Sequence, residues 1–187
     1  MDLKPWKILK FETAFKNKWW DIVQEMVELP DGSIIEDFFV SRHPGSAVIL
    51  ALTESNDVVV RRQYKHGCRE IVTELPIGAL DASDADFVDA AKRELLEETG
   101  YGSGVWEAVG TLVPNPTSST SRVHVFLARG VRKVAEAEVN PREEGETSLV
   151  APAELMHMVA SGQLKTSAAV GAIFLAAERL GWIEARV

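Results

Sequence analysis

The sequence contains a single cysteine, Cys68, among its 187 residues. One cysteine cannot form a disulfide within the chain, and no cysteine or histidine spacing of the zinc-binding kind accompanies it, which favours a reducing, cytoplasmic location. The chain also lacks a long apolar run, because the longest, over 168–177, is far shorter than the ~18 residues that predict a membrane span. The first residues do not resemble a secretory signal. We therefore expect a cytoplasmic protein with no membrane partner.

Basic residues are scarce as well. Lys and Arg number 20 against 28 Asp and Glu, which gives a formal charge of −8. Proteins that bind a nucleic-acid backbone normally present a basic face, so we expect no nucleic-acid partner. An acidic protein can still act on an anionic substrate when divalent cations lie between them. The acidic excess is concentrated over residues 78–100, where seven acidic residues stand against two basic ones.

The first half of the chain has the pattern of β-strands. Apolar runs over 19–29 and 34–42 flank a Pro-Asp-Gly-Ser turn, in which Gly32 can adopt a positive φ, and they predict a hairpin. Runs over 47–53 and 58–63 flank a second turn and predict another hairpin. Further strands are predicted later in the chain, over 105–113, over 122–129 and around 149–150.

The strongest helix signal covers residues 86–99. Apolar residues recur there at three- and four-residue spacing, Asp84 or Asp86 can cap the start, and Gly100 can end the helix. Two further helices are predicted, over 153–160 and 167–180. Strands with interspersed helices and no strict alternation indicate an α+β fold rather than a doubly wound sheet.

Three carboxylates, Glu94, Glu97 and Glu98, share one face near the end of this helix. Each like-charged pair one turn apart costs about 0.2–0.5 kcal/mol, and the helix dipole is also unfavourable to anions there. Mg²⁺ or Mn²⁺ would offset this repulsion, because both cations prefer hard oxygen ligands. The alternative is a solvated acidic face with Lys92 and Arg93 as local partners.

The helix also carries most of a known motif. The residues Gly78, Arg93-Glu94, Glu97-Glu98 and Gly100, with apolar Leu95 and Tyr101, closely resemble the Nudix box, Gly-x5-Glu-x7-Arg-Glu-U-x-Glu-Glu-x-Gly-U, where U is a bulky apolar residue. The helical half of the motif matches in full. The loop half has one residue more than the family pattern, and Asp84 stands where the family has a Glu. Either Asp84 or Asp86 could take the place of that Glu.

The resemblance to the Nudix family implies an α/β/α sandwich on a mixed sheet and a loop-helix-loop that binds two or three Mg²⁺ or Mn²⁺ ions. It also implies hydrolysis of a nucleoside diphosphate linked to another group. By this resemblance Glu94 and Glu98 are metal ligands, and Glu97 is a third ligand or a supporting base. The backbone carbonyl of Ile77 is a further ligand, and Arg93 orients the glutamates.

Outside the box, most of residues 6–180 resemble the ADP-ribose/nucleotide-sugar pyrophosphatase branch of the family. The stretch Arg62-Gln63-Tyr64-Lys65, followed by Glu74-Leu75-Pro76-Ile77-Gly78, is similar to the Arg-Gln-Tyr-Arg and Glu-Leu-Pro-Ala-Gly pattern of that branch. The resemblance implies substrate contacts at Arg62, Lys65 and Gly78. Lys65 replaces an Arg of the family and cannot reproduce its bidentate geometry.

The acidic loop over 142–146 resembles the loop that supplies the general base in this branch, which makes Glu144 or Glu146 the expected base. A plain solvated loop is the alternative. Trp19 falls where some relatives stack an aromatic ring on the nucleobase, although a core or dimer-interface role is at least as compatible with its position. On strand alternation, one of Trp19 and Trp20 should face the core. The branch also implies a homodimer.

These patterns predict an N-terminal antiparallel β region over 1–45, for dimerisation and completion of the substrate site, and a Nudix domain over 46–187. The expected reaction is metal-dependent hydrolysis of ADP-ribose or a related nucleoside diphosphate sugar to a nucleoside monophosphate and a sugar phosphate. The box is also compatible with another diphosphate, such as GDP-mannose, NADH or a dinucleoside polyphosphate. A Nudix-fold binding module without catalysis is the second alternative, because the loop half of the box departs from the pattern.

Overall fold

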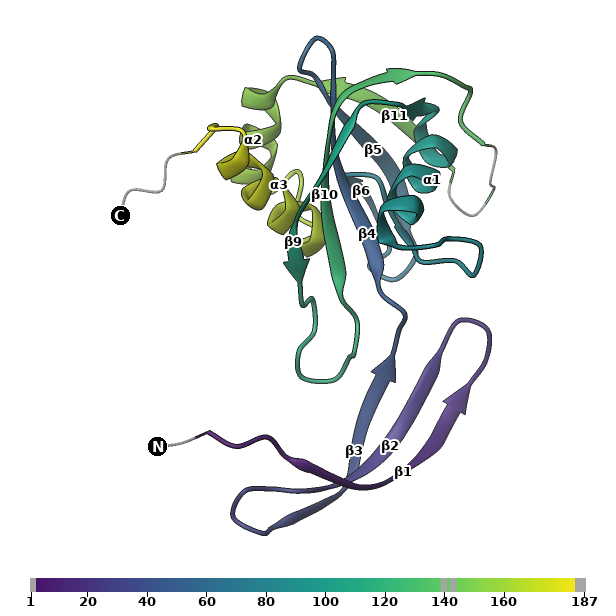
Figure 1. Cartoon of the computed structure of the whole chain (residues 1–187), viewed down its shortest axis with the longest axis vertical. Helices are drawn as coiled ribbons and strands as arrows, with labels where there is room; N and C mark the ends of the chain where they lie inside the picture. Colours follow the sequence, from purple (N-terminus) through teal and green to yellow (C-terminus); the bar gives the residue numbers. More distant parts are fainter. Residues whose placement is uncertain (1–2, 139–140, 142–143, 184–187) are drawn as a thin grey trace. The chain divides into compact units, whose positions relative to one another are not determined.

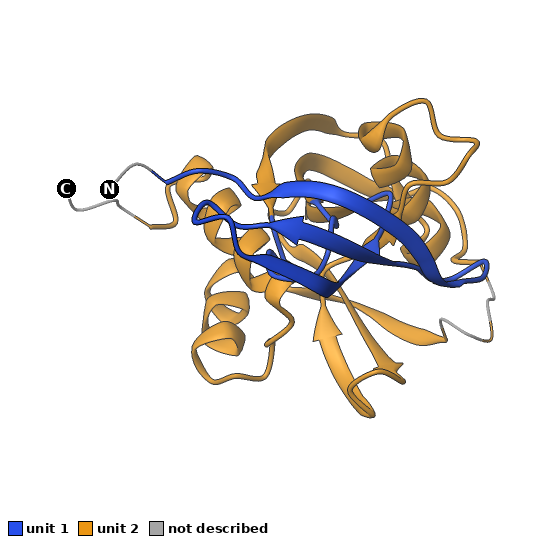
Figure 2. Cartoon of the chain, turned by 90° about the horizontal axis from the view of Figure 1, so that it is seen from below, with its two compact units in different colours: residues 1–45, 113–122 blue, residues 46–112, 123–187 orange. Residues whose placement is uncertain are grey.

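The structure is a computed structural model that describes residues 3–138, 141 and 144–183. The chain forms two compact units, and Figure 2 shows them in different colours. Unit 1 consists of residues 1–45 and 113–122, and unit 2 of residues 46–112 and 123–187. We describe each unit separately. The division predicted from the sequence, between 1–45 and 46–187, stays a prediction.

Unit 1 is built on an antiparallel sheet in the order β1-β2-β3. Its strands are β1 (Lys7–Lys16), β2 (Asp21–Glu28) and β3 (Ile34–Arg42). The predicted hairpin is confirmed, because β2 pairs with β3 across a turn in which Gly32 has a φ of +86°. Strand β1 was not predicted, and the reason is that all ten of its residues are exposed, so the strand lacks a buried, alternating face.

The beginning of β2 differs from the prediction. The strand starts at Asp21, so Trp19 and Trp20 precede it, in a bend where the Asn17 side chain accepts hydrogen bonds from both of their backbone N–H groups. The expectation that one tryptophan faces the core is therefore wrong, since Trp19 is 62% exposed and Trp20 is 49% exposed. Strand alternation does not apply to residues held in a bend.

Unit 2 contains a mixed sheet in the order β11-β5-β4-β10-β8, with β6, β7 and β9 paired to β5, β4 and β10 respectively. Strands β10 and β4 are parallel, whereas β11 and β6 pair with β5 in antiparallel fashion. The strands are β4 (Ser46–Thr53), β5 (Val58–Lys65), β6 (Glu70–Glu74), β7 (Ile77–Ala79), β8 (Tyr101–Gly102), β9 (Val105–Leu112), β10 (Val123–Lys133) and β11 (Gly145–Val150).

Helices cover both faces of this sheet (Figure 1). Helix α1 (Phe87–Thr99) packs Ala91 and Leu95 against Ile49 and other residues of one face. Helices α2 (Pro152–Ala160) and α3 (Ser167–Arg179) cover the other face, where Ile173 belongs to the same cluster as Leu50. Neighbouring residues of β4 thus point to opposite layers, as strand geometry requires. The predicted α+β class, with a mixed sheet between helices, is confirmed.

Helix α1 is fixed at both ends. The Asp86 side chain accepts hydrogen bonds from the backbone N–H groups of Val88 and Asp89, and Gly100 ends the helix with a φ of +74°. The predicted helix over 86–99 is confirmed, with Asp86 rather than Asp84 as its cap. Within the described part of the chain, no helix has both the length and the apolar character needed to cross a membrane.

Candidate active site

The guanidinium of Arg93 connects the loop before α1 to the carboxylates on the helix. Its Nε and Nη2 donate to the two carboxylate oxygens of Asp84, at 3.0 and 2.9 Å. Its Nη1 donates to Glu94 Oε1 at 2.8 Å and to Glu97 Oε2 at 2.9 Å. Hydrogen bonding to Asp84, and then to the two glutamates, raises the pKa of Arg93. Arg93 therefore offsets the repulsion between Glu94 and Glu97.

Asp84 takes the place of the glutamate expected in the loop. Its side chain is only 4% exposed, and hydrogen bonding from Arg93 lowers its pKa. The turn that presents it is closed locally, since Asp84 Oδ2 accepts from the backbone N–H of Asp81 at 2.8 Å. Asp86 caps the helix instead. The structure thus accommodates the inserted residue between β7 and α1 and retains a carboxylate on Arg93.

Gly78, in β7, provides space for the Glu94 carboxylate. A Cβ atom at position 78 would lie 1.8 Å from the Glu94 carboxylate carbon and 2.1 Å from its nearer oxygen. Any other residue would force Glu94 to move. A role in packing against Glu94 therefore accounts for this glycine, and its predicted contact with substrate stays a prediction.

Glu98 is the buried member of the three glutamates, at 8% exposure. Its Oε2 accepts a hydrogen bond from the backbone N–H of Ile77 at 3.3 Å. Burial raises the pKa of Glu98 to about 7, against the opposing charges of Arg61 and Lys65. The structure thus brings Ile77 to Glu98 through its N–H, and the ligand role predicted for the Ile77 carbonyl stays a prediction.

The three glutamates are chemically suited to a hard divalent cation, because all offer carboxylate oxygens. Glu98 is also buried, which raises its pKa, and a bound cation would favour its charged form. As the side chains lie, the described residues contain no group of three or more His, Cys, Asp or Glu that could hold a metal ion. Arg93 instead engages Glu94 and Glu97. The carboxylate oxygens fit Mg²⁺ or Mn²⁺ as ligands, and in this structure two of the three carboxylates are paired with the Arg93 guanidinium.

A second set of buried polar residues adjoins Glu98 on strands β5 and β6. Arg61 is 4% exposed and donates to the backbone carbonyl of Glu98. Glu74 Oε1 accepts from Lys65 Nζ at 2.7 Å and from Gln63 Nε2 at 2.8 Å. Sequence reasoning did not predict roles for Arg61, Gln63 or Glu74. The signal that could have found the two residues of β5 is strand alternation. Arg61 and Gln63 follow Val59 at every second position and therefore continue its buried face.

Arg62, Glu144 and Glu146 form a separate group. Arg62 and Glu146 lie directly opposite each other on β5 and β11, joined by an exposed contact of 3.4 Å. They line, with Glu144 and neighbouring residues, a cavity of about 430 Å³. By strand alternation, Arg62 points to the sheet face opposite Arg61, which contacts Glu98. The base and substrate roles predicted for this group stay predictions, and Arg142 and Glu143 of the same loop lie outside the described residues.

Trp19 belongs to unit 1 and is mostly exposed. The ammonium of Lys18 lies 4.5 Å from the centroid of its ring, a cation–π distance. The predicted contact of Trp19 with the nucleobase stays a prediction.

Comparison with known proteins gives consistent results. A family model described as NUDIX domain matches residues 42–170. ADP-ribose pyrophosphatase of Mycobacterium tuberculosis is 29% identical over 87% of this chain and 78% of its own length. ADP-ribose pyrophosphatase of Bacillus subtilis is 30% identical over 85% of this chain and 81% of its own length. Methanol dehydrogenase activator of Bacillus methanolicus is 31% identical over 70% of each protein.

Among solved structures, the chain is similar to a crystal structure described as ADP compounds hydrolase, with a TM-score of 0.84 and 20% sequence identity. The similarity covers 97% of both chains. At this identity the likeness concerns the fold. It confirms the sandwich predicted from the sequence resemblance, including the antiparallel region that precedes the mixed sheet.

Proposed function

We propose, on the premise that this chain belongs to the Nudix family of hydrolases, that it cleaves the pyrophosphate bond of ADP-ribose or a related nucleoside diphosphate sugar. The resemblance to this family and to its ADP-ribose pyrophosphatase branch is confirmed by the family match and by two relatives that each cover more than three quarters of the chain. The products would be a nucleoside monophosphate and a sugar phosphate. We propose a cytoplasmic location, because Cys68 is an exposed free thiol.

The observation that supports the proposal most is that Glu98, at the end of α1, adjoins the buried Arg61 of β5, whose guanidinium donates to the Glu98 backbone carbonyl. The positive charges of Arg61 and Lys65 partly offset the rise in the pKa of Glu98 that burial causes. A diphosphate needs cations near its oxygens and a carboxylate near its attacking water. This corner of unit 2 offers both, whereas the face below α2 and α3 offers buried apolar side chains.

The proposed reaction is attack of water on one phosphorus atom with cleavage of the bridging P–O bond. A bound Mg²⁺ or Mn²⁺, two or three per site by family resemblance, would neutralise the phosphates and lower the pKa of the water. Glu94 and Glu98, with Glu97 and the Ile77 carbonyl, would hold these ions, and Arg93 would orient the glutamates. Lys65 would bind the diphosphate near Gly78, and Arg62, on the opposite face of β5, would contact another part of the substrate. Glu144 or Glu146 would accept the proton of the water, with Glu97 as the third candidate.

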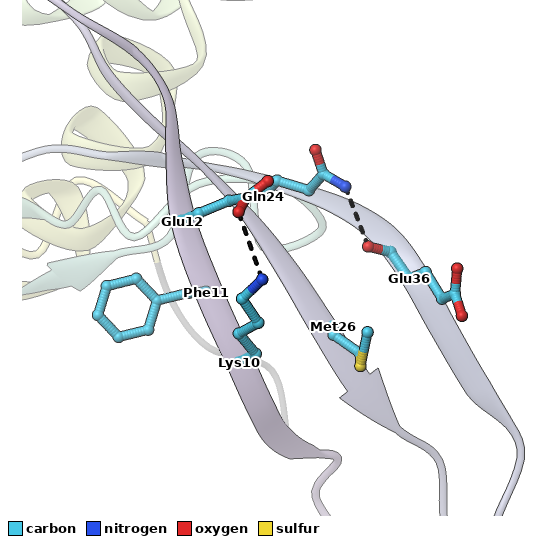
Figure 3. A pocket seen from close by; sticks show the side chains of 6 residues that line it. All are labelled: Lys10, Phe11, Glu12, Gln24, Met26 and Glu36. Atoms are coloured by element: carbon cyan, nitrogen blue, oxygen red, sulfur yellow. Dashed lines mark hydrogen bonds and ion pairs between the residues drawn. The ribbon is translucent and has the colours of Figure 1, made fainter.

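We further propose that the protein acts as a homodimer through unit 1. The sheet of unit 1 exposes large apolar side chains, among them Ile8, Phe11, Phe15 and Phe39, each at about half exposure or more. Exposed apolar surface of this kind marks interaction sites in soluble proteins. The sheet also carries a cavity of about 150 Å³. Side chains of β1, β2 and β3 line it (Figure 3). Residues 1–45 would then supply the dimer contact, with Trp19 facing the nucleobase, and residues 46–187 the catalytic domain.

A catalytically inactive binding module is the second candidate function. The observation that favours it is the departure of the loop half of the box, where one residue is inserted before α1 and Asp84 stands in place of the family glutamate. Such a module would bind ADP-ribose and leave the pyrophosphate bond intact.

The decisive experiment incubates the protein with ADP-ribose, GDP-mannose, NADH and a dinucleoside polyphosphate, each with Mg²⁺, with Mn²⁺ and with a chelator. Chromatography identifies the products. We expect AMP and ribose 5-phosphate from ADP-ribose in the presence of metal, and no products with chelator. Faster cleavage of another member would correct the substrate. Binding of ADP-ribose by calorimetry without cleavage of any member would replace the enzyme with the binding module.

A further inference from the structure

We infer that Glu74 is a positioning residue whose buried carboxylate holds the ammonium of Lys65 in place for the diphosphate of the substrate. The inference rests on the proposed function, because it concerns how that site binds its substrate. The Glu74 carboxylate pairs with Lys65, and its effect on the substrate is exerted through that ammonium.

The geometry concentrates two donors on one oxygen. Glu74 Oε1 accepts from Lys65 Nζ at 2.7 Å and from Gln63 Nε2 at 2.8 Å. The Glu74 side chain is only 7% exposed, whereas that of Lys65 is 39% exposed. The ion pair therefore has a buried end and an end that reaches solvent. The ammonium has three donors, so two remain for a phosphate after Glu74 is satisfied.

Burial makes this contact stronger than an ordinary surface ion pair. Lys165 and Glu70, at the other end of β6, form an ion pair in which both side chains are half exposed. Such exposed pairs contribute little, because solvent screens the charges and both side chains lose freedom. Glu74, in contrast, would be left as an unpaired buried charge if Lys65 moved away, which carries a large penalty. Lys65 is therefore confined near Glu74.

This confinement matters because of the residue type at position 65. Lysine has a flexible stem and a point-like charge, whereas arginine has a planar fork that orients itself on a phosphate. A lysine that binds phosphate gains from an external restraint on its position.

The test is a double-mutant cycle with Lys65→Met, Glu74→Gln and the double variant, assayed on ADP-ribose with Mg²⁺. Lys65→Met should raise KM about tenfold, the loss expected for one hydrogen bond to a charged group. Glu74→Gln should raise KM about fivefold with kcat within about twofold, because it alters binding and not chemistry. In the Lys65→Met background, Glu74→Gln should have no further effect on KM.

Glu136→Gln is the control, because Glu136 also pairs with a lysine, Lys133, at 2.9 Å, yet its side chain is exposed. It should leave KM and kcat unchanged. If the two effects on KM multiply in the double variant, to about fiftyfold, Glu74 acts independently of Lys65 and the inference is wrong. If Glu74→Gln does not fold, Glu74→Asp replaces it, since the shorter carboxylate keeps the charge and withdraws from Lys65.

Failure of this inference is distinguishable from failure of the proposed function. Wild-type protein that binds ADP-ribose without cleaving it contradicts the proposed reaction alone, and the same cycle is then measured on Kd. Wild-type turnover with multiplicative effects contradicts the role of Glu74 alone. Wild-type protein that neither binds nor cleaves ADP-ribose removes the basis of both.

Discussion

The two faces of the sheet in unit 2 differ in what they bury. The buried charged residues of the described chain, Arg61, Glu74 and Glu98, lie on the α1 side, whereas the face below α2 and α3 packs apolar residues such as Leu50 and Ile173. Below α1, the apolar cluster extends along β5 only to Val59, after which Arg61 and Gln63 continue the same face and remain buried. Their neighbour Arg62, on the opposite face, is exposed. Strand β5 therefore contributes to the apolar core with one face and to the charged site with the other. Burial distinguishes its two arginines, Arg61 and Arg62.

The largest expected effect concerns the charged face. Glu98→Gln should lower turnover of ADP-ribose by about 10³-fold. The variant loses a charged ligand of the expected metal ion, and metal ions stabilise the transition state by several kcal/mol. The free energy of unfolding should not fall, because a buried charge is removed. Steady-state kinetics and urea unfolding measure the two quantities. Unchanged turnover would contradict the assignment of the site to α1.

The apolar face should respond in the opposite way. Ile173, on α3, is fully buried, and Ile173→Ala should lower the free energy of unfolding by about 2–5 kcal/mol through lost burial and a residual cavity. The specific activity of the folded protein should stay within about twofold. Ile173→Val serves as the graded control and should cost about 0.5–1.5 kcal/mol. A drop in kcat without a drop in stability would show that the two faces are not separate.

The pH dependence of stability should distinguish the faces as well. Glu98 has a folded pKa of about 7 against an ordinary value of 4.5, so the folded chain binds its proton more tightly than the unfolded chain. Stability of the metal-free protein should therefore fall as pH rises from about 5 to 7, by about 3 kcal/mol in total. Glu98→Gln should remove this component. Urea unfolding with a chelator between pH 5 and 8 measures the difference between the two proteins, and parallel profiles would contradict the prediction.

The helix caps provide the smallest contrast. Asp86→Ala should cost about 1 kcal/mol, because the Asp86 side chain accepts two backbone hydrogen bonds at the start of α1. Thr166, at the start of α3, makes no side-chain cap hydrogen bond, and its buried hydroxyl has no partner among the described residues. Thr166→Val should therefore be neutral or stabilising. A loss of stability in Thr166→Val as large as that in Asp86→Ala would contradict this difference, and thermal unfolding of both variants measures it.

Local signals were sufficient for much of this molecule. The helix over 86–99 could be predicted because its apolar spacing, its capping aspartate and Gly100 all indicate the same boundaries. Strand pairs around short turns were equally accessible. The motif on α1 identified the three glutamates and Arg93, and the structure shows Arg93 in contact with Glu94 and Glu97.

What could not be predicted depends on long-range packing. The sequence left Asp84 and Asp86 as alternatives, because only the folded loop shows which carboxylate reaches Arg93. The partnership of Glu74 with Lys65 joins residues on two strands whose register no local pattern specifies. Strand β1 escaped prediction because none of its residues is buried. Each of these features depends on which segment lies beside which.

Unit 1 is made of two segments that are far apart in the sequence. Residues 113–122 belong to this unit, although the chain reaches them only after β9. Ser41 binds this segment through its backbone, as its N–H donates to Ser118 and its carbonyl accepts from Thr120. A gene deletion that ends at codon 45 would therefore leave a loop without its hydrogen-bond partners. Transplanting the N-terminal sheet to another protein would require two separate pieces of coding sequence, so the sheet and the loop have to be gained, exchanged or lost together.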